Sequence, residues 1–276
     1  MKIAVLSGKG GAGKTLVAVN LAASAERAVY VDCDVEEPNG RLFFKPEGVL
    51  AQTVSTRVPV FDAARCSGCR QCVAFCRFNA LICVKEKPMV FPEVCHACGG
   101  CRLVCPADAI SEAERPVGVI ERGKHGSTEV VTGILNPGEA SGMAVIRAAL
   151  EAGEGSDGPV ILDCPPGSAC AVMESVSRAD CCLLVAEPTA FGFDNFKMVY
   201  ELAALLGKPC GVVVNKMETP YQPLERFCRE RQLPVLLHIP YSRELARMAA
   251  GGVIAAENGQ RALFDTLWTQ IGGVLR

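Results

Sequence analysis

The sequence predicts an α/β fold with a mostly parallel sheet in three layers, interrupted by a smaller α+β domain. Short apolar runs recur along the chain, and stretches with helical patterning separate them, which is typical of strands alternating with crossover helices. A cysteine-rich segment in the first half breaks this alternation. We therefore predict that residues 1–57 and 116–276 form the larger domain and that residues 58–115 are the insert.

Length, charge and hydropathy narrow the possible classes of protein. The 276 residues suit one large α/β domain or two smaller ones, and half of them are hydrophobic. A formal charge of −2 argues against a nucleic-acid surface driven by bulk positive charge. No apolar run reaches the roughly 18 residues of a membrane span, and no signal peptide precedes the first strand. We expect a cytoplasmic protein with no membrane span and no nucleic-acid partner.

The first predicted strand, 3–6, and the helix that follows, 16–25, flank a glycine-rich loop. This loop fits the pattern of a glycine, four residues, then Gly-Lys-Ser/Thr: Gly8, Lys9, Gly10, Gly11, Ala12, Gly13, Lys14 and Thr15. Glycines let backbone N–H groups wrap a phosphate, and the helix N-terminus favours negative charge. We expect Lys14 to reach the β- and γ-phosphates of ATP and Thr15 to hold Mg²⁺. The alternative is a glycine-rich turn with no ligand.

Acidic residues follow two later strands. The run 29–31 ends in Asp32-Cys33-Asp34, and the run 160–162 ends in Asp163, followed by Cys164-Pro165-Pro166-Gly167. Carboxylates at the C-terminal ends of parallel strands face the ligand crevice. With Lys9 as a second lysine in the glycine-rich loop, these features resemble the deviant Walker A ATPases, which include MinD, ParA and the nitrogenase iron protein.

This resemblance implies roles for individual residues. Lys9 would cross a dimer interface to the partner's nucleotide, and Asp34 would orient the attacking water. Asp32 would lie near Mg²⁺, and Asp163 would bind Mg²⁺ through water as the Walker B acid. The plainer alternatives are a solvated Lys9 and loop-capping aspartates.

A base-binding region is expected near the C-terminal half of the sheet. The strand 211–214 leads into Asn215 and Lys216, and the last strand ends at Pro240 and Tyr241. By resemblance, Asn215 contacts adenine and the Pro240-Tyr241 pair lies beside it. Glu218 stands where a guanine-specific site has Asp, so we expect ATP rather than GTP.

Nine of the sixteen cysteines fall between positions 66 and 105. All of them except Cys83 belong to two runs with the same x₂, x₂, x₃ spacing, offset by 29 residues. This is the run of bacterial two-cluster ferredoxins, in which the fourth cysteine ligates the other cluster. The resemblance assigns one [4Fe-4S] cluster to Cys66, Cys69, Cys72 and Cys105, and a second to Cys95, Cys98, Cys101 and Cys76. Two zinc knuckles are the alternative.

Together the segments resemble MinD-like ATPases that contain an inserted ferredoxin domain. The resemblance implies a P-loop NTPase fold, ATP hydrolysis, the cofactors ATP, Mg²⁺ and two [4Fe-4S] clusters, and an ATP-dependent homodimer or heterodimer with a similar ATPase. A redox or metal-cofactor protein would be the partner, for electron transfer or for cofactor or cluster assembly. Two alternatives are an iron-sulfur scaffold or carrier and a MinD/ParA-type positioning ATPase. The scaffold is disfavoured because the C-terminal half has no Cys-x-x-Cys pair.

Overall fold

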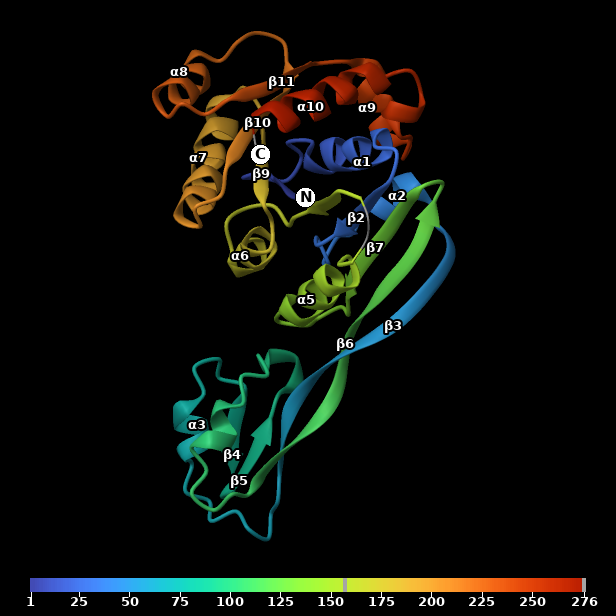
Figure 1. Cartoon of the computed structure of the whole chain (residues 1–276). Coiled ribbons are helices and arrows are strands. Elements are labelled where there is room, and N and C mark those ends of the chain that lie inside the picture. Colours follow the sequence, from blue (N-terminus) through green and yellow to red (C-terminus); the bar gives the residue numbers. More distant parts are fainter. Residues whose placement is uncertain (156–157, 275–276) are drawn as a thin grey trace.

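The computed structural model describes residues 1–155 and 158–274. Within them, nine strands form one sheet in the order β11-β10-β9-β1-β8-β2-β7-β6-β3 (Figure 1). The strands from β11 to β7 are parallel, whereas β6 is antiparallel to β7 and to β3. The α/β fold with a mostly parallel sheet is therefore confirmed. The sheet strands are β1 (Lys2–Leu6), β2 (Ala28–Asp32), β3 (Glu47–Phe61), β6 (Ile110–His125), β7 (Thr128–Leu135), β8 (Val160–Asp163), β9 (Cys181–Ala186), β10 (Cys210–Met217) and β11 (Val235–Pro240).

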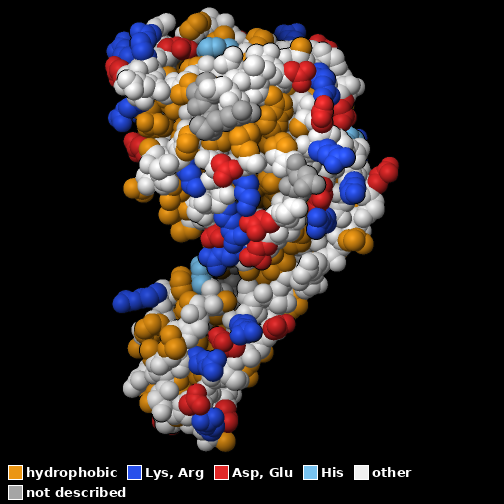
Figure 2. Space-filling model, viewed as in Figure 1, with side chains coloured by type: hydrophobic (Ala, Val, Ile, Leu, Met, Phe, Trp, Pro, Cys, Tyr) orange, Lys and Arg blue, Asp and Glu red, His pale blue; other side chains and the backbone are white. Residues whose placement is uncertain are grey.

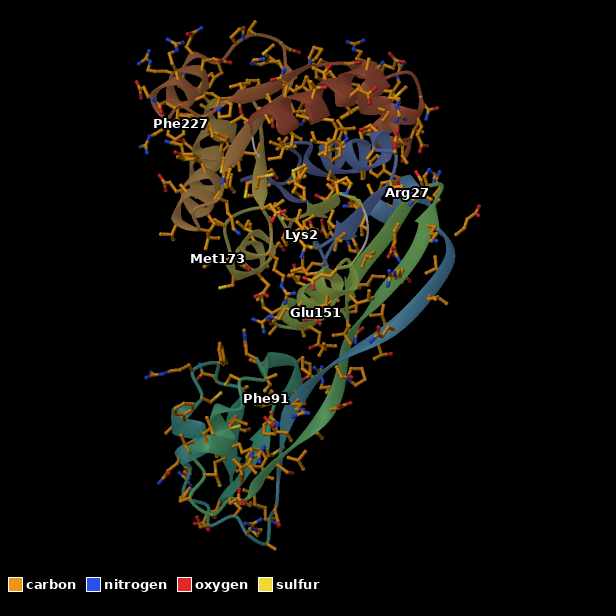
Figure 3. The ribbon with its side chains drawn as sticks, viewed as in Figure 1. Lys2, Arg27, Phe91, Glu151, Met173 and Phe227 are labelled. Atoms are coloured by element: carbon orange, nitrogen blue, oxygen red, sulfur yellow. The ribbon has the colours of Figure 1, made fainter. Side chains whose placement is uncertain are left out.

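Helices cover both faces of this sheet and complete three layers. One apolar core lies beneath α5 (Met143–Ala152), α6 (Cys170–Ser177), α7 (Ala190–Leu205) and α8 (Gln222–Glu230). The other lies beneath α1 (Lys14–Ser24), α2 (Gly40–Phe44), α9 (Arg243–Ala250), η2 (Ala255–Glu257) and α10 (Arg261–Val274). On the first face, Phe227 of α8 meets three aromatic rings of α7 edge-on, at centroid distances of 5.3 to 6.0 Å (Figure 3).

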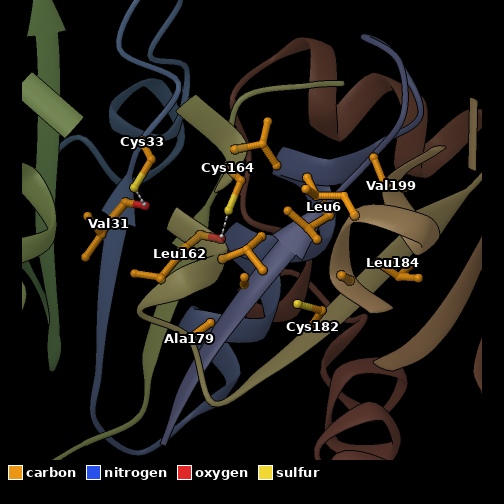
Figure 4. Packing of buried hydrophobic residues seen from close by; sticks show 14 of the residues in the cluster. Leu6, Val31, Cys33, Leu162, Cys164, Ala179, Cys182, Leu184 and Val199 are labelled. Carbon is orange, nitrogen blue, oxygen red and sulfur yellow. Dashed lines mark hydrogen bonds between the residues drawn. The ribbon is translucent and has the colours of Figure 1, made fainter. Parts of the chain in front are cut away.

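Most cysteines outside the two runs act as small apolar residues. Cys33 and Cys164 follow β2 and β8 and are fully buried beside Leu6 and Leu162 (Figure 4). Each thiol lies close to the carbonyl two residues earlier in its strand, 3.9 Å for Cys33 and 3.6 Å for Cys164. Burial raises the pKa of both thiols, that of Cys164 to about 12. They are therefore neutral packing groups beneath the acidic strand ends.

The strands β3 and β6 form a long antiparallel ribbon that extends beyond the edge of the sheet (Figure 1). Only the stretch of β6 from Gly118 onward pairs with β7, so residues 110–117 project with their partners in β3. At about 3.4 Å per residue this projection is roughly 27 Å long. The predicted boundaries at 57/58 and 115/116 fall inside these continuous strands, at nearly the same level of the ribbon.

The ribbon carries a small lobe at its far end. The lobe contains α3 (Gln71–Phe75), β4 (Leu81–Val84), β5 (Lys87–Val90), η1 (Pro92–Val94) and α4 (Gly100–Leu103). Its two halves repeat in space as well as in sequence. Pro59 pairs with Glu112 across β3 and β6, and Cys83 pairs with Pro88 across β4 and β5. A shift of 29 residues converts Pro59 to Pro88 and Cys83 to Glu112, so the two strand pairs occupy equivalent places.

The lobe is also held to the body by a contact that we call the clasp, the ion pair of Arg115 with Glu139. The two terminal guanidinium nitrogens of Arg115, Nη1 and Nη2, donate to the two carboxylate oxygens of Glu139 at 2.7 and 2.6 Å. Beside it, the Ala140 amide donates to the carbonyl of Glu93 in the lobe at 3.0 Å. The loop that follows β7 therefore links the lobe to the main sheet.

The body presents both signs of charge on the side that faces the lobe. Figure 2 shows a belt of mixed basic and acidic side chains over α5 and α6. Its pairs include Lys2 with Glu154 at 3.0 Å and Arg178 with Glu151 at 3.5 Å, and Figure 3 labels Lys2 and Glu151 there. This face does not have the uniform positive charge that nucleic-acid backbones require.

Candidate functional site

A large cavity lies at the C-terminal ends of the parallel strands. Its volume is about 770 Å³, which is within the range of small-molecule sites. The ends of β10 and β11 and the residues that follow β1, β2 and β8 meet there, as expected for a doubly covered sheet. Its lining includes most of the predicted phosphate and base residues: Lys9, Gly10, Gly11, Gly13, Lys14, Thr15, Asp34, Asn215, Lys216, Pro240 and Tyr241.

Close packing shapes the glycine-rich loop. Gly13 adopts a φ of 96° immediately before α1, a conformation that other residues rarely adopt. A Cβ at this position would lie 2.0 Å from Nδ2 of Asn215. That nitrogen instead donates to the Ala12 carbonyl at 2.8 Å, and Asn215 is 3% exposed. Asn215 therefore holds the loop from the side where the sequence predicts the base.

Lys14 is buried among carboxylates. Its Nζ lies 2.5 Å from Oδ1 of Asp163 and 3.7 Å from Oδ2 of Asp34. Burial alone would lower its pKa, but the charge and hydrogen bond of Asp163, together with the charges of Asp32 and Asp34, outweigh this effect and the pKa is raised. Lys14 therefore stays positively charged, and it could exchange its carboxylate partners for a phosphate.

The carboxylates of Asp32 and Asp34 differ in their surroundings. Asp32 is fully buried and accepts hydrogen bonds from the amides of Asp34 at 3.2 Å and Gly40 at 2.9 Å. Burial, and then the charge of Asp163, raises the pKa of Asp32 to about 8. Asp34 reaches the cavity, and burial raises its pKa to about 6. Asp32 thus anchors the loop that carries Asp34.

Tyr30 was not predicted as a site residue, because in the sequence it is one of several apolar residues of a buried strand, β2. Its side chain is fully buried, and its hydroxyl donates to Oδ2 of Asp163 at 2.7 Å. Burial, followed by the charges of Asp163 and Asp32, raises its pKa, so the hydroxyl keeps its proton. No local pattern could reveal this contact, because 133 residues separate Tyr30 from Asp163.

Lys9 is held on its own chain. Its Nζ lies 2.7 Å from Oε2 of Glu187 and 5.3 Å from the ring centroid of Phe191. Lys216 is 3.9 Å from the same carboxylate, and its Nζ donates to the Gly11 carbonyl at 2.7 Å. Glu187 therefore pairs with two lysines that line the cavity, a role that no sequence pattern around it indicates.

The predicted base region also includes a helix that the sequence did not point to. Pro240 and Tyr241 line the cavity together with Leu245 and other residues of α9. The N-cap of α9, Ser242, accepts a hydrogen bond from the Leu245 amide at 3.2 Å. This cap fixes the start of α9 beside the cavity wall.

The structure brings the eight clustered cysteines together in two separate sets, each lining its own cavity in the lobe. One cavity is lined by Cys76, Cys95, Cys98 and Cys101, with Glu112 nearby. The other is lined by Cys66, Cys69, Cys72 and Cys105, with Cys83 nearby. In each set, one cysteine comes from the other run of the sequence. All sixteen cysteines are free thiols.

The spacing of these thiols bears on the kind of metal they could hold. Within residues 1–155 and 158–274, no group of three or more His, Cys, Asp or Glu side chains is arranged to hold a single metal ion. Zinc thiolates lie about 2.3 Å from the metal, so four of them need a tight cage. Around a four-iron cubane the thiolates bind the corners of a larger body. Burial raises the pKa of Cys101 to about 11, so it is a neutral thiol without metal.

Comparison with known sequences identifies the family of the chain. Residues 3–254 match the family described as the CobQ/CobB/MinD/ParA nucleotide binding domain. The chain belongs to this family. In this CobQ/CobB/MinD/ParA member the glycine-rich loop connects β1 to α1. None of the helices in the part of the chain that the structure describes is long and apolar enough to cross a membrane.

Two relatives come from Methanocaldococcus jannaschii. The uncharacterized protein MJ0578 is 31% identical over 267 residues, which cover 95% of this chain and 92% of the relative. The uncharacterized protein MJ0579 is 27% identical over 221 residues, covering 78% and 80%. Both likenesses therefore extend over most of the relative's length.

Solved structures of similar fold include three MinD proteins. The Pyrococcus furiosus cell division ATPase MinD is 17% identical with a TM-score of 0.58, covering 99% of this chain and 98% of MinD. The septum site-determining protein MinD of Pyrococcus horikoshii, complexed with Mg-ADP, is 16% identical with a TM-score of 0.58, covering 98% and 95%. The MinC:MinD cell division protein complex of Aquifex aeolicus is 15% identical with a TM-score of 0.55, covering 98% of this chain and 95% of that one. These likenesses confirm the P-loop NTPase fold.

Proposed function

We propose that this protein binds and hydrolyses ATP and that its nucleotide state is coupled to two [4Fe-4S] clusters in the lobe. The glycine-rich loop and Lys14 would bind the phosphates, and Asp34 would orient the attacking water. Thr15 and Asp163 would hold Mg²⁺, with Asp32 beside them, and Mg²⁺ would neutralise phosphate charge. Asn215, Lys216, Pro240 and Tyr241 would surround the base.

The observation that carries the cluster proposal is the gathering of two four-cysteine sets around two cavities. The lobe donates backbone hydrogen bonds to sulfur as well, since the Ala109 amide lies 3.3 Å from Sγ of Cys105. Such contacts are among the features that tune iron-sulfur potentials. Clusters held there would accept and donate single electrons.

A short series of contacts joins the nucleotide cavity to the lobe. Val35 follows Asp34, and its carbonyl accepts from the Leu135 amide at 2.9 Å. Leu135 ends β7 and leads into the loop that carries Glu139 of the clasp and the Ala140 amide. A movement of the Asp34 loop on ATP binding would therefore reach the lobe through packed backbone.

The partners follow from the same arrangement. Lys9 would leave Glu187 to contact the nucleotide of a second subunit, in a homodimer or a heterodimer with a similar ATPase. The lobe would then exchange electrons with a redox protein, or support metal-cofactor or cluster assembly on a partner. We place this protein in the cytoplasm, where thiols stay reduced.

Iron content tests the cluster proposal first. We expect about eight irons per chain after anaerobic reconstitution, and about four in Cys66→Ala and in Cys95→Ala, because each variant loses one cluster. Cys170→Ala is the matched control, since Cys170 is an exposed cysteine outside both sets and should leave the iron content unchanged. Iron content near zero in the unmodified protein would overturn the cluster assignment.

The ATPase rate tests the coupling. It would be measured with the clusters oxidised and then reduced by dithionite, beside Lys14→Ala. We expect a rate that changes with cluster state and is lost in Lys14→Ala. An unchanged rate in a protein with both clusters bound would refute direct coupling of ATP hydrolysis to cluster redox state. It would favour a MinD/ParA-type positioning ATPase, whose fold the chain shares. Transfer of the clusters to an apo-protein would instead favour a scaffold.

A further inference from the structure

We propose that Tyr30 is a positioning residue for the Mg²⁺ site: its hydroxyl holds one oxygen of Asp163 so that the other oxygen faces the nucleotide. This inference rests on the proposed nucleotide and Mg²⁺ site and adds a residue to it. The two oxygens of Asp163 have different partners. Oδ2 accepts from the Tyr30 hydroxyl at 2.7 Å, and Oδ1 accepts from Lys14 at 2.5 Å.

The ring of Tyr30 is fixed in place by its neighbours. It is fully buried in β2, and its centroid lies 5.0 Å from that of Phe44. On the other side it contacts the backbone of Gly40, where a Cβ would lie 2.2 Å from the tyrosine hydroxyl. Gly40 also donates its amide to Asp32 at 2.9 Å. The absence of a side chain at Gly40 therefore leaves space for a hydroxyl at this place.

The consequence for Asp163 depends on which of its partners moves. Lys14 is the residue that leaves for the phosphates when nucleotide binds, which exposes Oδ1. Tyr30 lies in a central strand and stays with Oδ2. Asp163 is 1% exposed, so without the hydroxyl Oδ2 would be a buried acceptor without its donor. The carboxylate would then rotate or take Lys14 with both oxygens, in competition with the phosphates and with Mg²⁺.

Tyr30→Phe removes only the hydroxyl and keeps the packed ring. The readout is the dissociation constant of ADP with Mg²⁺ and with EDTA, measured by isothermal titration calorimetry on the full chain. We expect Tyr30→Phe to reduce the enhancement of ADP binding by Mg²⁺ about tenfold, while affinity in EDTA is unchanged. Tyr200→Phe is the matched control, because Tyr200 lies in α7, packs on Phe227 and does not line the cavity.

The possible outcomes separate this inference from the proposed function. If Mg²⁺ does not enhance ADP binding in the unmodified protein, the proposed Mg²⁺ site fails. If Mg²⁺ enhances binding equally in the unmodified protein and Tyr30→Phe, the site stands and the role of Tyr30 is refuted. A lower urea midpoint with an unchanged enhancement would show a purely structural role and would also overturn the proposal. Gly40→Ala, whose Cβ would lie 2.2 Å from the same hydroxyl, should also reduce the enhancement, and an unchanged enhancement in it would count against the role of Tyr30.

Discussion

The clasp gives a prediction whose size follows from its geometry. Arg115→Ala removes two charged hydrogen bonds of 2.6 and 2.7 Å and leaves Glu139, whose side chain is 8% exposed, without its partner. Charged hydrogen bonds of this kind contribute about 2 kcal/mol when partly buried. A loss of about 2 kcal/mol corresponds to a roughly thirtyfold increase in local opening.

Amide hydrogen exchange measures that opening directly. The Ala140 amide is bonded to the Glu93 carbonyl across the same junction, so its exchange should become about thirtyfold faster in Arg115→Ala. Arg41→Ala is the control, because Arg41 of α2 pairs with Glu121 on the same ribbon. The pair of Arg41 with Glu121 is 3.2 Å long with side chains 41% and 31% exposed, so its loss should change exchange by about twofold or less. Unchanged exchange at Ala140 in Arg115→Ala would refute the clasp as a link between lobe and body.

Three further predictions concern the nucleotide cavity. Gly40→Ala places a Cβ 2.2 Å from the buried ring of Tyr30, so urea unfolding should show a loss of about 1–3 kcal/mol in the free energy of unfolding. Burial raises the pKa of Asp34 to about 6, and only its ionised form can accept a proton from water, so kcat/KM for ATP should fall as pH drops below that value. A flat profile down to pH 5 would exclude Asp34 as the water-orienting carboxylate. Asn215→Ala loses the 2.8 Å hydrogen bond to the Ala12 carbonyl, and calorimetry should show ADP binding about tenfold weaker. An equal affinity would mean that the glycine-rich loop keeps its conformation without this hydrogen bond.

The sequence predicts the sheet core and the glycine-rich loop well because both depend on local patterns. Buried strands such as β1 and β9 are continuous apolar runs, and the loop has a fixed spacing. The part of β3 that forms the edge of the main sheet was not predicted. Residues 47–53 of β3 are all exposed, so they show no apolar alternation, and their stability comes from cross-strand hydrogen bonds.

The details of the site were less accessible to sequence reasoning. Tyr30 and Glu187 have roles only because distant segments approach them, Asp163 in one case and the two lysines in the other. The pairing of each cysteine run with a residue of the other run follows from spacing only with the help of a resemblance. Its structural counterpart, Pro59 opposite Glu112 and Cys83 opposite Pro88, needs strand register that no sequence pattern displays.

The two strands of the ribbon leave and re-enter the body side by side, and this has a consequence for the modular construction of the fold. Thr53 of β3 lies opposite Val119 of β6, so the chain leaves and re-enters the body at adjacent points. A two-residue Asn-Gly turn across this level would close a hairpin while preserving the register of the remaining strands. Such a deletion should leave the order of the other strands in the sheet unchanged. A fold of this kind can gain or lose its cysteine-rich extension by lengthening or shortening one hairpin, with the strand order beneath the nucleotide left unchanged.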